Sequence, residues 1–100
     1  MVHNREEILR VVIECLSTMQ RCCPSGGITE QCDPIRHLGC DSPDGLDFAC
    51  AVEEKLGIHI PEDVNPLVDD KAKRGRKVGD IVTLLERMAV EQEANCVPKQ

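Results

Sequence analysis

The sequence predicts an all-α protein, a small bundle of three to four helices with a long first loop. Apolar residues recur at the i, i+3, i+4, i+7 spacing of a helical face in three separate segments. Glycine and proline separate these segments. Only Ile58-His59-Ile60 alternates as a strand does, and one short strand has no partner to bond. We therefore expect an extended connector there and no sheet.

The first helix is expected to follow Asn4, which can cap it, with Glu7 three residues later as in a capping box. Its buried face should consist of Ile8, Val11, Val12, Cys15, Leu16 and Met19. An irregular stretch over residues 21–40 should follow, because Pro-Ser-Gly-Gly at residues 24–27 breaks helix and strand alike. A loop this long in a small domain is often functional. We expect it to be anchored by Ile28, Ile35 and Leu38.

A second helix is expected to start at Ser42, because serine is a favoured N-cap and Pro43 suits the first turn. Gly57 should end this helix. With Phe48 on the flank, the inward face is expected to contain Leu46, Ala49, Cys50, Val52 and Leu56. The other side of the helix is acidic.

The chain after Pro61 should contain a short helical turn at residues 64–68 and a polar loop at residues 69–77. This loop holds five basic residues, Lys71, Lys73, Arg74, Arg76 and Lys77. They form either a solvated surface or a loop that docks on a partner or contacts an anion. The last helix should run from Val78 to about residues 90–93, with an inward face of Val78, Ile81, Val82, Leu85, Met88 and Ala89.

The length of 100 residues indicates a single domain over residues 1–100, with an ordered core at about residues 4–92 and a flexible tail at 93–100. Phe48 is the only aromatic residue, which argues against a stacking platform for single-stranded nucleic acid. The net charge of −6 should repel duplex nucleic acid and anionic membranes and attract basic partners. No segment has the roughly 18 apolar residues of a membrane span.

Seven cysteines cannot all pair with one another, because their number is odd. The charged N-terminus does not look like a signal peptide, so we expect free thiols in the cytoplasm. Two alternatives remain open for the loop from Cys22 to Cys40. One is a small zinc module that uses this loop, although the paired ligands of structural zinc sites are incomplete and no metal is expected. The other is a disulfide from Cys22 or Cys23 to Cys32.

Motifs in the second half of the chain follow one another in a specific order. Residues 38–56 read L-G-C-D-S-P-D-G-L-D-F-A-C-A-V-E-E-K-L, G-I-H-I-P follows, and V-G-D begins the last helix. In this order they resemble the acyl carrier protein family, whose signature combines Leu-Gly, Asp-Ser-Leu, an acidic helix and an I-x-I-P connector. The resemblance extends from the first helix to the last. It implies a bundle of the acyl-carrier type.

The resemblance implies a carrier and not an enzyme. Ser42 matches the serine to which a phosphopantetheinyl transferase attaches 4'-phosphopantetheine from coenzyme A, and Asp41 matches the aspartate that supports recognition by that transferase. The thiol of the attached arm would hold acyl intermediates as thioesters for fatty acid, polyketide or related lipid biosynthesis. Since no base lies near Ser42 in the sequence, we expect no catalytic residue.

Two further sets of residues acquire roles under this resemblance, and a monomer is the default state. Acyl-loading and acyl-processing enzymes with basic patches would dock on Asp44, Asp47, Glu53 and Glu54. The cleft that shelters the acyl chain would be lined by Phe48, Val52, Ile60 and Val68.

The sequence departs from the family pattern at three places. Pro43 replaces the leucine that offers partners an exposed apolar contact. His37 stands where the family usually has an acid, so binding near it can depend on pH. The connector from Pro61 to Val78 is longer than in fatty-acid carriers. These departures indicate a specialised carrier, and the alternative is a non-carrier bundle that uses its acidic helix only for interaction.

Overall fold

The computed structural model describes residues 4–19, 26–41, 43–61, 63–69 and 74–95. For residues 93–95 it describes only the backbone. The regular elements follow the order α1 (Arg5–Met19), α2 (Pro34–His37), α3 (Asp44–Leu56), β1 (Val68–Asp69), β2 (Arg74–Gly75) and α4 (Val78–Asn95).

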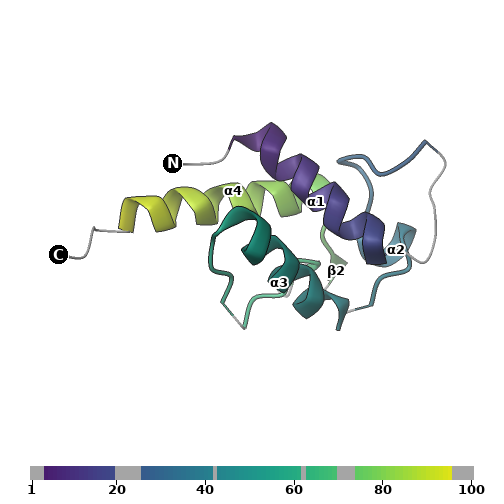
Figure 1. Cartoon of the computed structure of the whole chain (residues 1–100). Coiled ribbons are helices and arrows are strands. Elements are labelled where there is room, and N and C mark those ends of the chain that lie inside the picture. The colour runs from purple at the N-terminus through teal and green to yellow at the C-terminus, as the bar shows by residue number, and fades with distance from the viewer. Residues whose placement is uncertain (1–3, 20–25, 42, 62, 70–73, 96–100) are drawn as a thin grey trace.

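The fold is mainly helical, as the sequence predicts. α1 packs against both α4 and α3, and the C-terminal half of α4 extends beyond the rest of the bundle (Figure 1). The strands form a two-stranded antiparallel sheet in which Val68 lies opposite Gly75 and Asp69 lies opposite Arg74. Within the described residues, no helix is long and apolar enough to cross a membrane.

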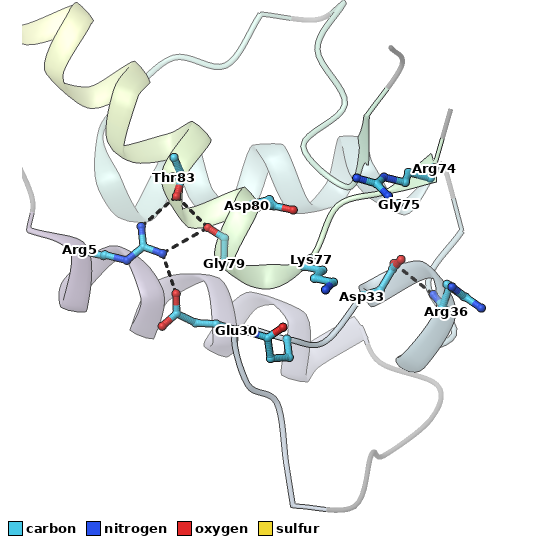
Figure 2. A pocket seen from close by; sticks show the side chains of 11 residues that line it. Arg5, Glu30, Asp33, Arg36, Arg74, Gly75, Lys77, Gly79, Asp80 and Thr83 are labelled. Atoms are coloured by element: carbon cyan, nitrogen blue, oxygen red, sulfur yellow. Dashed lines mark hydrogen bonds and ion pairs between the residues drawn. The ribbon is translucent and has the colours of Figure 1, made fainter. Parts of the chain in front are cut away.

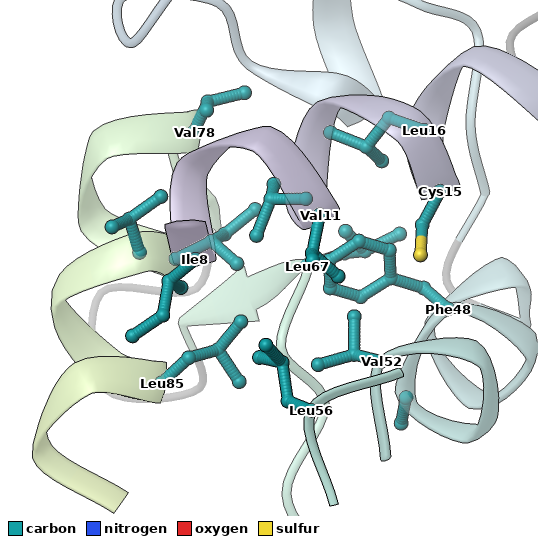
Figure 3. Packing of buried hydrophobic residues seen from close by; sticks show 14 of the residues in the cluster. Ile8, Val11, Cys15, Leu16, Phe48, Val52, Leu56, Leu67, Val78 and Leu85 are labelled. Carbon is teal, nitrogen blue, oxygen red and sulfur yellow. The ribbon is translucent and has the colours of Figure 1, made fainter. Parts of the chain in front are cut away.

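α1 begins and packs as its sequence predicts. The side-chain Oδ1 of Asn4 accepts the backbone N–H of Glu7 at 2.7 Å, which confirms the N-cap. The buried residues repeat at helical spacing along one stripe and are Ile8, Val11, Val12, Cys15 and Leu16. This stripe meets the buried faces of α3 and α4 in one hydrophobic core (Figure 3).

The inward face of α3 differs from the predicted one. Phe48 is fully buried, whereas Leu46 is 58% exposed and Cys50 is exposed, so the prediction was wrong for these three side chains. Successive residues of a helix are about 100° apart, and positions two before and two after Phe48 therefore lie on the opposite side. The Phe48 ring is fully buried in the core. Because Phe48 faces inward, Leu46 and Cys50 face outward. The buried side of α3 consists of Gly45, Phe48, Ala49, Val52 and Leu56.

The long first loop contains a short helix, α2, that the sequence pattern did not predict. Asp33 is only 7% exposed, and its Oδ1 accepts the backbone N–H of Ile35 at 3.0 Å and of Arg36 at 3.3 Å. Pro34 occupies the first position of α2. An aspartate followed by proline is a helix-start signal, but four residues are too few to show a helical period. The predicted anchors are confirmed, since Leu38 is buried and Ile28 and Ile35 pack partly buried against the core.

The chain between α3 and α4, residues 57–77, is called the connector below, and it differs in part from expectation. Residues 58–60 have no regular secondary structure and pair with neither strand, in agreement with the predicted connector. The predicted helical turn at 64–68 is wrong at its end, because Val68 belongs to β1, and the predicted polar loop contains β2. Lys71 and Lys73 lie outside the described residues. α4 begins at Val78 as predicted and ends slightly later than expected.

Candidate functional site

The turn that enters α3 is the first part of the candidate site. Asp41 and Pro43 are both exposed, and Ser42 between them lies outside the described residues. The Asp44 N–H donates to the Asp41 carbonyl at 2.9 Å, and Asp44 Oδ2 accepts the Asp41 N–H at 2.8 Å. This reciprocal pair fixes the backbone on both sides of position 42.

Residues 38–40 explain how the turn is held against the bundle. Leu38 and Cys40 are both buried, and their N–H groups donate to the Pro34 carbonyl at 3.2 and 3.0 Å. Gly39 between them has a φ of 75°, a left-handed conformation that residues with a side chain rarely adopt. The Leu-Gly-Cys segment thus anchors the turn and leaves Asp41 at the surface.

The four acidic residues predicted for docking have two kinds of surroundings. Asp47 and Glu54 are exposed, whereas Asp44 and Glu53 are half-buried. Asp44 accepts the hydrogen bond at the helix entry described above. Glu53 Oε2 accepts the Ile60 N–H at 2.7 Å and lies 3.2 Å from His59 Nδ1. Half of the predicted docking set therefore also fixes the ends of α3.

An apolar strip that was not predicted from the sequence lies on the outer side of α3. Leu46 and Cys50 are one turn apart and lie on the side opposite Phe48. Asp47 and Glu54 flank this strip on one side and Glu53 flanks it on the other, according to the 100° rotation per residue. Centring the helical face on Phe48 would have revealed the strip from the sequence.

The four residues predicted to line an acyl cleft occupy the core. Phe48, Val52 and Ile60 are buried, and Val68 packs partly buried against them. Figure 3 shows Phe48 and Val52 together with Leu67 of the connector, between α1 and α3. The structure therefore brings the four residues into one apolar cluster.

A separate polar groove of about 560 Å³ is lined by residues of α1, α2, β2 and α4 (Figure 2). The Arg5 guanidinium lies at one end, where Nη2 donates to Glu30 Oε1 at 2.6 Å and Nη1 donates to Thr83 Oγ1 at 3.0 Å. The hydrogen bond to Glu30 is the main cause that raises the pKa of Arg5 above its usual value. The groove also contains Arg74 and Lys77 of the predicted basic loop.

The described cysteines carry free thiols, and three of them, Cys15, Cys32 and Cys40, are buried. Burial raises the pKa of the Cys15 thiol, which agrees with its predicted role as a small core residue. Because Cys32 is free, the structure gives no support to a disulfide at Cys32. Cys22, Cys23 and Cys96 lie outside the described residues.

The zinc alternative finds no support in the part of the chain that the structure describes. No group of three His, Cys, Asp or Glu side chains there could hold a metal ion. His37 is exposed, and its Nδ1 accepts the Asp33 N–H at 2.8 Å, so this ring nitrogen already has a partner. Cys40 is almost fully buried.

Comparison with known proteins identifies relatives along most of the chain. No family model matches the chain, and no solved structure matches it. The acyl carrier protein of Helicobacter pylori is 31% identical over 81 residues, which cover 81% of this chain and 88% of the relative. The acyl carrier protein of Helicobacter acinonychis is 32% identical over the same shares. That of Campylobacter hominis is 32% identical over 83 residues, covering 83% of this chain and 90% of the relative. The chain therefore belongs to the acyl carrier protein family, whose members are carriers and not enzymes.

Proposed function

We propose that this chain carries acyl groups as thioesters on a 4'-phosphopantetheine arm attached to Ser42. The observation that carries the proposal is the Asp41-Ser42 pair at the entry to the acidic helix α3, in a chain of the acyl carrier protein family. The exposure of Asp41 and Pro43 supports it, because a transferase must reach the residue between them.

The surroundings of position 42 fit a phosphodiester. α3 starts at Asp44, and the N-terminal end of a helix favours a negative charge. The Asp41 carboxylate is exposed and available to support the transferase. When attached, the arm supplies the thiol that holds the acyl group. The protein itself presents the arm and offers a surface to its partners.

We propose that partners dock on the outer side of α3, where acidic residues flank the Leu46–Cys50 strip. These partners are a phosphopantetheinyl transferase and the acyl-loading and acyl-processing enzymes of fatty acid, polyketide or related lipid biosynthesis. Asp44, Asp47, Glu53 and Glu54 would attract basic patches on these enzymes and speed encounter. Leu46 lies one turn beyond Pro43, so it offers the apolar contact that Pro43 lacks.

The apolar cluster of Phe48, Val52, Ile60 and Val68 is the proposed shelter for the acyl chain. Its location between α3 and the connector supports this role, since Val68 reaches partly to the surface where β1 begins. We also propose a cytoplasmic location, where the buried thiols of Cys15, Cys32 and Cys40 remain reduced.

Attachment to Ser42 is tested by intact-protein mass spectrometry. The full chain is incubated with coenzyme A and a panel of phosphopantetheinyl transferases, one of them from the source organism. We expect a mass gain of one phosphopantetheinyl group in the wild-type chain and no gain in Ser42→Ala.

The matched control is Ser17→Ala, which removes another exposed serine hydroxyl, one that bonds within α1 to the Ile13 carbonyl. This variant should gain the same mass as the wild-type chain. If no transferase modifies the wild-type chain, the carrier proposal is wrong and the non-carrier interaction bundle becomes the better interpretation.

A further inference from the structure

The first turn of α3 is packed against the connector at one unusually close contact. Gly45 is buried. A methyl group added to it would lie 2.5 Å from Asn65 Cγ and 2.7 Å from Asn65 Nδ2, and closer still to Oδ1. These separations are too short for nonbonded carbon contacts. Position 45 can therefore hold no side chain while Asn65 keeps its place.

Asn65 is itself held by its own segment. Its Oδ1 accepts the Leu67 N–H at 2.9 Å, and its carbonyl accepts the Val68 N–H at 3.2 Å. The half-buried Arg76 joins both ends of this segment. Its Nη1 donates to the Asn65 carbonyl at 2.8 Å and to the Val68 carbonyl at 2.9 Å, and we call this pair of bonds the Arg76 clamp. Leu67 between them is fully buried. These bonds from Leu67, Val68 and Arg76 hold Asn65 beside Gly45.

The same connector also contacts the start of α2. A methyl group added to Gly75 of β2 would lie 3.0 Å from the Cγ of Asp33, the residue that caps α2. The connector therefore touches the chain at Asp33 and again at Gly45. These two contacts bracket the segment that contains Asp41 and position 42.

We propose that Asn65 is a positioning residue for the attachment serine and that Arg76 holds Asn65 in place. The inference rests on the proposed function of Ser42. Asn65 fills the space beside Gly45 and thereby fixes the position of the first turn of α3. The position of this turn would in turn affect how well a transferase reaches residue 42. Asn65 and Arg76 both lie between α3 and α4, one before β1 and the other after β2.

A double-variant cycle on the full chain tests the contact. Initial rates of phosphopantetheine transfer are measured for wild type, Gly45→Ala, Asn65→Ala and the double variant, at a temperature where circular dichroism shows every variant folded. We expect Gly45→Ala to lower kcat/KM about tenfold, and the double variant to return within about threefold of Asn65→Ala, because the missing amide makes room for the methyl group.

Two further variants separate positioning from general damage to the fold. Gly79→Ala alters a first-turn glycine of α4, where the added methyl would lie 3.3 Å from Glu30, and it should leave the transfer rate unchanged. Arg76→Gln removes the clamp, so the rate loss caused by Gly45→Ala should become smaller in that background. Amide NMR shifts of Asp41 and Asp44 should change in Gly45→Ala and return in the double variant.

The outcomes are distinguishable. If the wild-type chain is loaded and folded Gly45→Ala is loaded equally fast, Asn65 does not position the serine and this inference is wrong. The inference is also wrong if Gly45→Ala lowers the transfer rate and the double variant transfers no faster than Gly45→Ala. If no transferase loads the wild-type chain, the proposed function fails and the inference fails with it.

Discussion

At the scale of single residues, the side chains of Glu53 and Gln92 hold the chain that follows α3. Glu53 belongs to the acidic set on α3, and its carboxylate also accepts the Ile60 N–H at the start of the connector. Gln92 of α4 holds the same connector, because its amide bonds both the N–H and the carbonyl of His59. The end of α3 is therefore tied to α4 by two polar side chains.

The buried thiol of Cys15 makes the stability depend on alkaline pH. Burial raises its pKa in the folded state above the usual value of 9.0, so the unfolded chain loses this proton first as the pH rises. The protonated Cys15 thiol contributes fully to stability below the pKa of the unfolded chain. This contribution is lost as the pH rises through the higher pKa of the folded state. We expect the free energy of unfolding to fall above about pH 9, measured by urea denaturation at several pH values.

The control for this prediction is Cys15→Ala, which removes the titrating group. Its overall stability should be lower because of the cavity, but the decline of stability at alkaline pH should be shallower than in the wild-type chain. An identical slope in the two proteins would show that Cys15 does not contribute to it.

At the scale of elements, α3 has one side in the core and an exposed side that carries the proposed docking strip. Phe48, Val52 and Leu56 face inward, and the Leu46–Cys50 strip faces outward between acidic residues. Leu46 and Val90 are the only large hydrophobic residues in the described part of the chain that are clearly exposed. Val90 belongs to the C-terminal half of α4. This half extends beyond the rest of the bundle (Figure 1).

A charge at Leu46 should weaken docking without weakening the fold. We expect Leu46→Glu to lower kcat/KM for phosphopantetheine transfer about tenfold, because central apolar contacts dominate many interfaces. Val90→Glu is the matched control, since it adds the same charge at a residue that is 49% exposed, and it should transfer at the wild-type rate. Equal rates for the two variants would contradict a docking role for Leu46.

At the scale of the whole molecule, one small core joins all the elements that position the site. α1 packs on α3 and α4, while the connector adds Leu67 to the same cluster. The charged groove between α1, α2, β2 and α4 holds Arg36, Arg74 and Lys77, and none of its lining residues comes from α3. The basic side chains of this groove are thus separated from the acidic face, although the net charge is −6.

Phe48→Ala should show how much of this arrangement depends on one ring. Loss of a buried phenylalanine typically lowers stability by about 3–5 kcal/mol, a large share of the roughly 5–15 kcal/mol of a small domain. We expect the variant to be largely unfolded near 37 °C, measured by thermal circular dichroism. Cys50→Ala, which truncates an exposed side chain of the same helix, should change the stability by less than about 0.5 kcal/mol.

Local sequence patterns predict the helical class, the cap at Asn4 and the ends of α3 and α4 to within a few residues. The Asp-Ser motif is read directly from the sequence. These features depend on local chemistry and on periodicity, and both can be recognised from neighbouring residues. The similarity to acyl carrier proteins over 81–83% of the chain agrees with the family resemblance of the sequence.

Three features follow from packing between distant segments: the side of α3 that faces inward, the course of the chain between α3 and α4, and the close approach of Asn65 to Gly45. Leu46 and Phe48 are both apolar, so the sequence pattern allowed either phase, and the space between α1 and Leu67 selected the ring. The contact of Gly45 with Asn65 joins residues twenty positions apart, and no local signal specifies it. Packing between distant segments determines these features, and periodicity along one helix does not contain that information.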